Sequence, residues 1–102
     1  AKRLRLHVAA VFACNFTNHF YAIAEELLND KNMSFEMLKP LIFETCRKIE
    51  NIKPSEVQTG PAVRKDAETM KKHIRELEGY FSYQNLYTFV SESIVKKYKN
   101  DS

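Results

Sequence analysis

The chain has 102 residues, of which 44% are hydrophobic and 28% charged, so it is long enough for one folded domain and disorder is not expected. Its two glycines and three prolines are too few for the turns of an all-β domain, which favours a few long helices. The net charge of +3 is mild, and basic residues gather only at the two ends. We interpret these ends as solvated helix termini, so no nucleic-acid partner is expected.

Two further features concern the setting of the chain. There is no signal peptide and no apolar run of the roughly 18 residues that a membrane span needs, so we expect a cytoplasmic protein without a membrane partner. Cys14 and Cys46 lie far apart in apolar helical stretches, which predicts small buried hydrophobic residues rather than a disulfide or a metal site. The chain begins inside a helical pattern without an initiator Met, as expected of a piece of a longer protein or of a processed chain.

The segment from about Lys2 to Asn29 predicts a long first helix, because it lacks Gly and Pro and repeats apolar residues at helical spacing. At 100° per residue, six apolar side chains fall within about 80° and are expected to form the core: Ala9, Phe12, Phe16, Phe20, Ile23 and Leu27. A helix of about 40 Å is longer than so small a domain can cover. Its opposite face is therefore expected to meet a second partner.

Three more helices follow in the predicted order. A turn at residues 29–32 precedes a helix that Ser34 caps and that runs to about Asn51, and Pro40 should kink or restart it. Its buried stripe is expected to contain Leu38, Leu41, Ile42, Thr45, Cys46 and Ile49. After a loop, Asp66 caps a helix that ends near Glu78 and Gly79. Ser82 begins the last helix, whose inward residues are expected to be Leu86, Phe89, Val90, Ile94 and Val95.

The first candidate site is the polar face of the first helix. His7, Asn15 and Asn18 share this face with small residues, and asparagine is a poor helix former that is retained where its amide makes hydrogen bonds. The face could form the wall of a ligand cleft or a domain interface. It could equally pack on another helix with its amides satisfied.

The second candidate site is the segment from Thr59 to His73. Gly60 would let the backbone approach a ligand, and Arg64 offers a guanidinium for a carboxylate or phosphate. The alternative is a plain turn with an Arg64–Asp66 ion pair, and a structural role for His73. The histidines show no zinc spacing, and no dinucleotide-binding glycine motif is present, so no metal or complete cofactor site is expected within this chain.

In order along the chain, residues 7–16, Ala24–Leu28, Pro40–Leu41 and the pattern Thr59–Gly60–Pro61-x-x-Arg64-x-Asp66, with Thr69 and His73, resemble a helical domain of unknown function. In that family the domain follows a Rossmann domain in NADP oxidoreductases similar to pyrroline-5-carboxylate reductase and the 6-phosphogluconate dehydrogenase group. Two positions depart from the relatives: Val11 stands where several carry a lysine four residues before the asparagine, and Lys65 stands where a glycine is expected.

The resemblance implies an all-α fold, a single bundle of about four to six helices over residues 1–102, like the C-terminal domain of 6-phosphogluconate dehydrogenase. It further implies an N-terminal Rossmann domain of the same protein as partner, NADP or NAD bound in the parent protein, and homodimerisation. By similarity, His7, Asn15 and His73 are the catalytic candidates. The substrate-binding candidates are Asn18, Thr59, Gly60, Arg64 and Asp66.

Two functions are therefore expected from the sequence. The first is the helical substrate-cleft and dimerisation domain of an NAD(P)-dependent oxidoreductase, which is not active by itself. The second is a helical interaction module without enzymatic activity, which forms a homodimer through its apolar faces.

Overall fold

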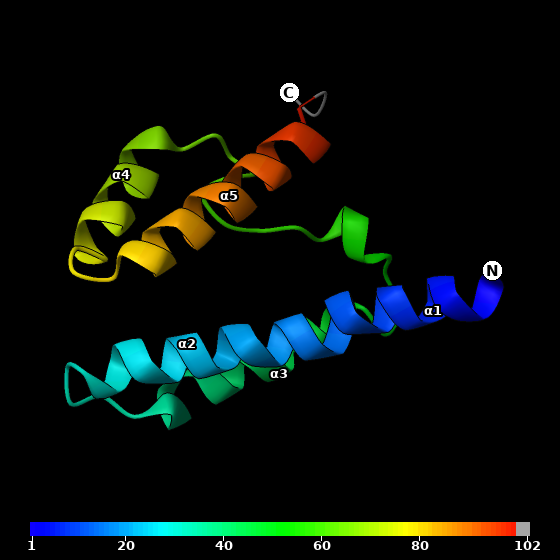
Figure 1. The fold of residues 1–102 in the computed structure, drawn as a ribbon, viewed down its shortest axis with the longest axis horizontal. Helices are drawn as coiled ribbons and strands as arrows, with labels where there is room; N and C mark the ends of the chain where they lie inside the picture. The colour runs from blue at the N-terminus through cyan, green and yellow to red at the C-terminus, as the bar shows by residue number, and fades with distance from the viewer. Residues whose placement is uncertain (100–102) are drawn as a thin grey trace. The chain divides into compact units, whose positions relative to one another are not determined.

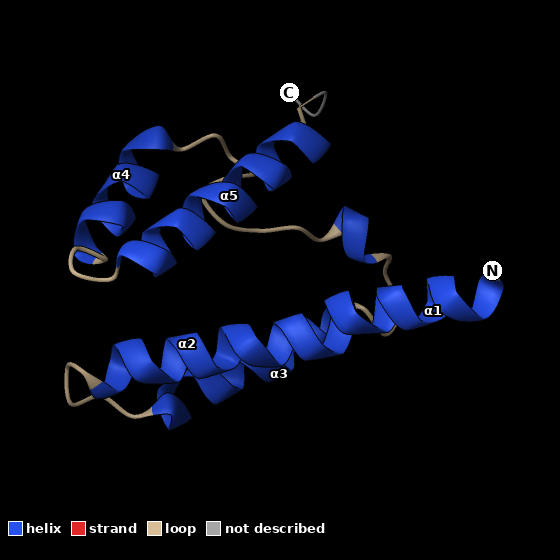
Figure 2. Cartoon of the chain, viewed as in Figure 1, coloured by secondary structure: helices blue, strands red, loops and turns tan. Residues whose placement is uncertain are grey.

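The computed structural model describes residues 1–99, and these residues form helices and loops without any strand (Figure 2). The all-α fold predicted from the sequence is thus confirmed. The chain divides into two units, Ala1–Glu50 and Asn51–Ser102, each of which is described by itself. Among the described residues, none of the helices combines the length and the apolar character needed to cross a bilayer.

Unit 1 begins with the long helix that the sequence predicts. It comprises α1 (Lys2–Ala10), a π-helical segment η1 (Val11–Phe16) and α2 (Thr17–Asn29), which follow one another without interruption (Figure 1). The side-chain hydroxyl of Thr17 donates a hydrogen bond of 3.2 Å to the carbonyl of Phe12, five residues earlier. A π-helical turn holds more residues than an α-helical turn, so the 100° spacing does not hold through η1.

The rest of unit 1 is a short 3₁₀ helix, η2 (Phe35–Leu38), followed by α3 (Lys39–Lys48). The Ser34 hydroxyl accepts a hydrogen bond from the Glu36 N–H at 3.1 Å, which confirms the predicted cap. Pro40 lies in the first turn of α3, so it restarts the helix, as expected from a residue that lacks a backbone donor. The rings of Tyr21 and Phe35 meet edge to face at 6.4 Å and hold η2 against α2.

The predicted core of unit 1 is largely wrong. On the first helix Ile23 and Leu27 are half-buried, but Phe12, Phe16 and Phe20 are 65%, 46% and 42% exposed. On the predicted stripe of the second helix Leu38 and Ile42 are half-buried, and the exposed residues are Leu41, Thr45, Cys46 and Ile49. Cys14 is also exposed, so the prediction of two buried cysteines is wrong. The periodicity identified apolar faces, but unit 1 has too few elements to cover them.

Unit 2 contains the 3₁₀ helix η3 (Pro54–Glu56), a loop, α4 (Ala67–Glu76) and α5 (Phe81–Lys97). The helix α4 ends two residues before the predicted end, and α5 begins one residue before Ser82. Gly79 has a φ of +94° in the turn between them, which suits a residue without a Cβ. The Gln84 side-chain amide donates to the Ile74 carbonyl at 2.8 Å, so it ties the start of α5 to the end of α4.

The buried apolar residues of the described chain are Ala62 and Leu77, both in unit 2, with exposed fractions of 4% and 9%. Leu86, Val90, Ile94 and Val95 are half-buried as their predicted inward positions suggest, but Phe89 is 75% exposed. The accessible surface is 8609 Å². Two separate compact bodies, each with half of the chain's mass of 11.9 kDa, would together expose only about 7,200 Å². Each unit therefore has apolar surface that its own elements do not cover.

Because Leu77 is the largest buried apolar side chain, Leu77→Ala should lower the free energy of unfolding by about 2–3 kcal/mol through lost burial and the cavity left behind. The measurement is urea unfolding of the chain followed by far-UV circular dichroism. Leu77→Met, which conserves volume, is the control and should cost less than about 1.5 kcal/mol. Equal losses for the two variants would contradict the assignment of Leu77 to the core.

Candidate functional site

The loop before α4 turns sharply at Gly60 and positions the side chain of Asp66 at the start of the helix. Gly60 has a φ of +105°, a backbone conformation that glycine adopts at little cost. The N–H of Asp66 donates to the carbonyl of Pro61 at 2.9 Å, and the N–H of Lys65 donates to the carbonyl of Ala62 at 3.0 Å. These bonds close residues 61–66 into a compact turn that delivers the side chain of Asp66 to the first turn of α4.

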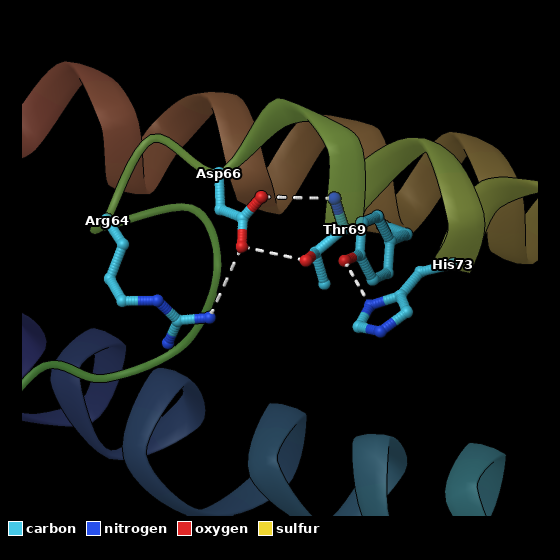
Figure 3. Close-up of polar contacts among 5 residues, drawn as sticks. Arg64, Asp66, Thr69 and His73 are labelled. Carbon is cyan, nitrogen blue, oxygen red and sulfur yellow. Dashed lines mark hydrogen bonds and ion pairs between the residues drawn. The ribbon is translucent and has the colours of Figure 1, made fainter.

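Asp66 caps α4 through both oxygens of its carboxylate (Figure 3). The Thr69 backbone N–H donates to Oδ1 at 3.2 Å, and the Thr69 hydroxyl donates to Oδ2 at 2.7 Å. These two hydrogen bonds, assisted by the nearby charges of Arg64 and Lys72, hold the pKa of the Asp66 carboxyl below its ordinary value of 3.8. Asp66 is therefore a stable anion at neutral pH that is already occupied by the helix end, which confirms its predicted capping role.

Arg64 forms an ion pair with this carboxylate, as one of the alternatives from the sequence expects. The distance from Nη2 to Oδ2 is 3.8 Å, and 59% of the arginine side chain is exposed. A pair this long and this exposed contributes little to stability. The guanidinium can therefore turn toward an external carboxylate or phosphate without breaking the cap, because Thr69 still satisfies both oxygens of Asp66.

His73 makes the second polar contact of this region, with a residue from the other helix. Its Nδ1 lies 2.7 Å from the hydroxyl of Tyr87 on α5, and the two rings meet edge to face with centroids 5.7 Å apart. His73 is exposed, whereas Tyr87 is half-buried. Burial raises the pKa of the Tyr87 phenol above its ordinary value of 10.0, so the hydroxyl keeps its proton at neutral pH.

These contacts form one polar row along α4, which we call the Arg64–His73 row: Arg64, Asp66, Thr69 and His73 (Figure 3). Positions 66, 69 and 73 are spaced by three and four residues, so they lie on one face of the helix. Arg64 enters from the preceding loop. Thr59 is exposed and Gly60 half-buried in the same loop, upstream of the turn that ends at Asp66. Unit 2 thus holds five of the candidates named from the sequence.

The other three candidates belong to unit 1. His7 is exposed in the last turn of α1, and Asn15 is exposed within η1. Asn18, in the first turn of α2, lines a small pocket of about 260 Å³ together with Tyr21, Ala22, Glu25 and Phe35. The π-helical segment η1 lies between His7 and Asn18. The spacing of 100° per residue, which predicts that they share a face, therefore does not apply across it.

A larger groove of about 740 Å³ lies between α4 and α5. Its apolar wall contains Met70, Ile74 and Val95, and its basic side chains are Lys71, Arg75, Lys96 and Lys99. None of the residues of the Arg64–His73 row lines this groove, so the row and the groove occupy different faces of α4. In the part of the chain that the structure describes, no three His, Cys, Asp or Glu side chains come together as metal ligands.

Tyr87 is a site residue that is not among the candidates named from the sequence. A signal was present: His73 and Tyr87 each lie seven residues from Tyr80, at the turn between two predicted helices. In an antiparallel helix pair, residues equally far from the turn face each other. Ile74 and Gln84, which are also bonded, each lie five residues from Gly79 in the same turn.

Comparison with known proteins supports the resemblance inferred from the sequence. A family model described as a domain of unknown function (DUF2520) matches residues 1–94. The crystal structure of a Bacteroides fragilis protein, named as a putative NADP oxidoreductase, is similar to this chain with a TM-score of 0.90 and 47% sequence identity. The match covers 93% of this chain and 37% of that one, so the chain spans little more than a third of the length of the solved protein. The curated proteins contain no match.

The cap on Asp66 makes a direct prediction about its titration. Because the pKa of Asp66 is lowered in the folded chain, its stabilising contribution is present above the ordinary pKa of 3.8 and is lost as the pH falls through the lowered value. Thr69→Val removes the hydroxyl donor, so the pKa of Asp66 should rise toward 3.8. The measurement is a ¹³C NMR titration of the Asp66 carboxyl.

Thr45→Val is the matched control for this titration. The Thr45 hydroxyl lies in unit 1 and donates to a carbonyl of its own helix, that of Leu41 at 2.8 Å. The pKa of Asp66 should be the same in this variant as in the unchanged chain. If Thr69→Val also leaves it unchanged, the cap described above does not set the ionisation of Asp66.

Proposed function

This chain belongs to the DUF2520 family, a domain of unknown function, and we propose that it is the helical half of an NAD(P)-dependent oxidoreductase. In this proposal the helical half forms one wall of the substrate cleft and contributes to dimerisation. A separate N-terminal Rossmann domain of the same protein forms the other wall. The single observation that carries the proposal is the close likeness of nearly the whole chain to about a third of a protein named as a putative NADP oxidoreductase.

The exposed apolar surface of unit 1 supports a role beside another domain. Along the first half of the long helix, apolar side chains of 46–72% exposure follow one another: Leu4, Leu6, Val8, Phe12 and Phe16. Leu4 and Val8 are four residues apart on α1, and the rings of Phe12 and Phe16 are in contact, so exposed apolar residues are grouped here as is typical of an interaction site. A helix so exposed is consistent with a wall against which a second domain packs.

The cofactor belongs to the other domain in this proposal. A dinucleotide site requires a strand, a glycine-rich turn and a helix N-terminus, and the described residues contain no strand. Gly60 and Gly79, the two glycines of the chain, lie in a loop and in a helix–helix turn. The residues of this chain therefore do not fit the nicotinamide cofactor, which would supply the hydride from its own domain.

The residues of the Arg64–His73 row suit the substrate side of such a cleft. Arg64 would hold a carboxylate or phosphate of the substrate with its exposed guanidinium. His73, or His7 from unit 1, would donate a proton to the oxygen or nitrogen of the carbonyl or imine that is reduced. Asn15, Asn18, Thr59 and Gly60 would contribute polar groups or close backbone approach to the cleft, and Asp66 would fix the start of α4.

The test is NADPH binding and turnover by the longer protein that contains this chain. We expect enhanced nicotinamide fluorescence on titration with NADPH, and oxidation of NADPH, followed at 340 nm, with small cyclic imine carboxylates and 2-oxo acids as probes. Residues 1–102 alone should show neither response. Tight NADPH binding by residues 1–102 alone, or no binding by the longer protein, would exclude the proposal.

Within that protein, Arg64→Ala should raise the KM for a carboxylate-bearing probe by about tenfold or more, since a charge-assisted hydrogen bond is lost. The kcat should change less. Arg47→Ala is the matched control, because Arg47 forms a similarly exposed ion pair with Glu44 at 2.9 Å on α3. An unchanged KM for Arg64→Ala would remove Arg64 from the substrate site.

A homodimerisation module without enzymatic activity is the second candidate, and one observation favours it. Phe12 and Phe16 form an exposed edge-to-face pair with ring centroids 5.1 Å apart, which is a ready apolar contact for a second copy. In the longer protein, Phe12→Lys should then shift the sedimentation coefficient from dimer to monomer. Glu50→Lys, which introduces the same residue at another exposed position of unit 1, should not. A monomeric unchanged protein would exclude this candidate.

A further inference from the structure

We propose that Tyr87 is a positioning residue that fixes His73 in one tautomer, with the proton on Nε2, so that His73 presents a hydrogen-bond donor at its outer edge. The kinetic consequence rests on the function proposed above, whereas the tautomer itself does not. The contact between His73 and Tyr87 joins the Arg64–His73 row to α5.

The geometry of the contact leaves one ring nitrogen for a ligand. Nδ1 of His73 lies 2.7 Å from the Tyr87 hydroxyl, a normal length for a strong hydrogen bond, and the rings are nearly perpendicular at 88°. The two nitrogens of an imidazole ring lie on different edges, so Nε2 is directed away from Tyr87. Because His73 is exposed, a ligand can reach this edge.

The direction of the hydrogen bond follows from the chemistry of the phenol. A tyrosine hydroxyl carries a single proton, and the raised pKa of Tyr87 means that this proton is retained well beyond neutral pH. A phenol is a good donor and a neutral imidazole nitrogen a good acceptor. The phenol oxygen can also accept from an Nδ1–H, but the arrangement in which the hydroxyl donates to a bare Nδ1 pairs the better donor with the better acceptor. In this arrangement the imidazole proton resides on Nε2.

The position of Tyr87 explains why the contact is held. The backbone of α5 is joined to that of α4 through the short turn at Gly79 and through the bond from Gln84 to the Ile74 carbonyl at 2.8 Å. Tyr87 is one turn of helix beyond Gln84 and half-buried, so its ring has a fixed place opposite His73. The exposed ring of His73 is thereby held by Tyr87, which is more buried than His73.

The chemical consequence is a hydrogen-bond donor beside a cationic anchor. An Nε2–H can donate a hydrogen bond to a carbonyl oxygen or to another acceptor that gains negative charge. Arg64, on the same row, would hold the carboxylate or phosphate of that compound. The ligand class is thus a small anion that also carries a carbonyl group.

The deciding experiment is ¹⁵N NMR of the histidine ring nitrogens in residues 1–102, recorded at about pH 9, where an ordinary histidine is neutral and tyrosine is still protonated. In the unchanged chain, Nδ1 of His73 should show the shift of a bare ring nitrogen and Nε2 that of a protonated one. In Tyr87→Phe, which keeps the ring but removes the hydroxyl, the ratio of the two tautomers should fall roughly fivefold, as expected for one lost hydrogen bond.

Tyr83→Phe is the matched control, because it removes a hydroxyl from the same helix one turn earlier, where the ring stacks on Tyr80. The His73 tautomer should be unchanged in this variant. A proton on Nδ1 in the unchanged chain, or the same tautomer ratio in Tyr87→Phe, would overturn the inference. The spectrum of the unchanged chain decides the point even where a variant does not fold.

In the longer protein, Tyr87→Phe should lower kcat for a carbonyl probe several-fold while KM stays within about twofold, since the donor is misoriented but Arg64 is intact. Absence of NADPH turnover in the unchanged protein would exclude the proposed function and leave the tautomer measurement as the test of this inference. Turnover with an unchanged kcat in Tyr87→Phe would exclude the role of Tyr87 in positioning the donor.

Discussion

The two hydrogen bonds between Asp66 and Thr69 determine how unit 2 presents its polar groups. They fix the residue at which α4 begins, and the start of a helix determines the direction in which each of its side chains points. His73 therefore lies on the same face as Asp66, and the turn at Gly79 brings Tyr87 opposite to it. Asp66 is bonded to Thr69, and the neighbouring Arg64 has an exposed guanidinium with a long contact of 3.8 Å to Asp66.

Unit 1 illustrates a different physical situation. Its amphipathic helices are well formed, but a single long helix with one shorter partner cannot bury a stripe of phenylalanines. Hydrophobic side chains that remain in water lower the stability of a monomer and favour association. The likeness to one part of a longer protein is consistent with this deficit. In that setting the exposed apolar residues would belong to interfaces rather than to the core of this chain.

Much of the secondary structure could be predicted from local signals, and the tertiary arrangement could not. Ser34, Pro40 and Asp66 mark helix starts through caps and a missing backbone donor, and these act within a few residues. Burial of a side chain depends on which other elements pack against its face of the helix. The periodicity that placed Phe12 and Phe89 on apolar faces does not contain this information, and both residues are exposed. The Arg64–His73 row could be predicted from residue spacing and family resemblance. To predict Tyr87, the pairing of two helices around a turn would have had to be known.

The π-helical segment Val11–Phe16 has a consequence for any alignment of relatives with this chain. A wide turn accommodates one more residue than an α-helical turn, and removing that residue would restore regular bonding without ending the helix. The two parts of the long helix would then be rotated relative to each other by about 100°. A related chain with one residue more or fewer here would keep the helix. The positions that correspond to His7 and Asn18 would then point in different directions relative to each other. A gap of one residue at this place would thus mark a change in the surface of the helix rather than a break in its backbone.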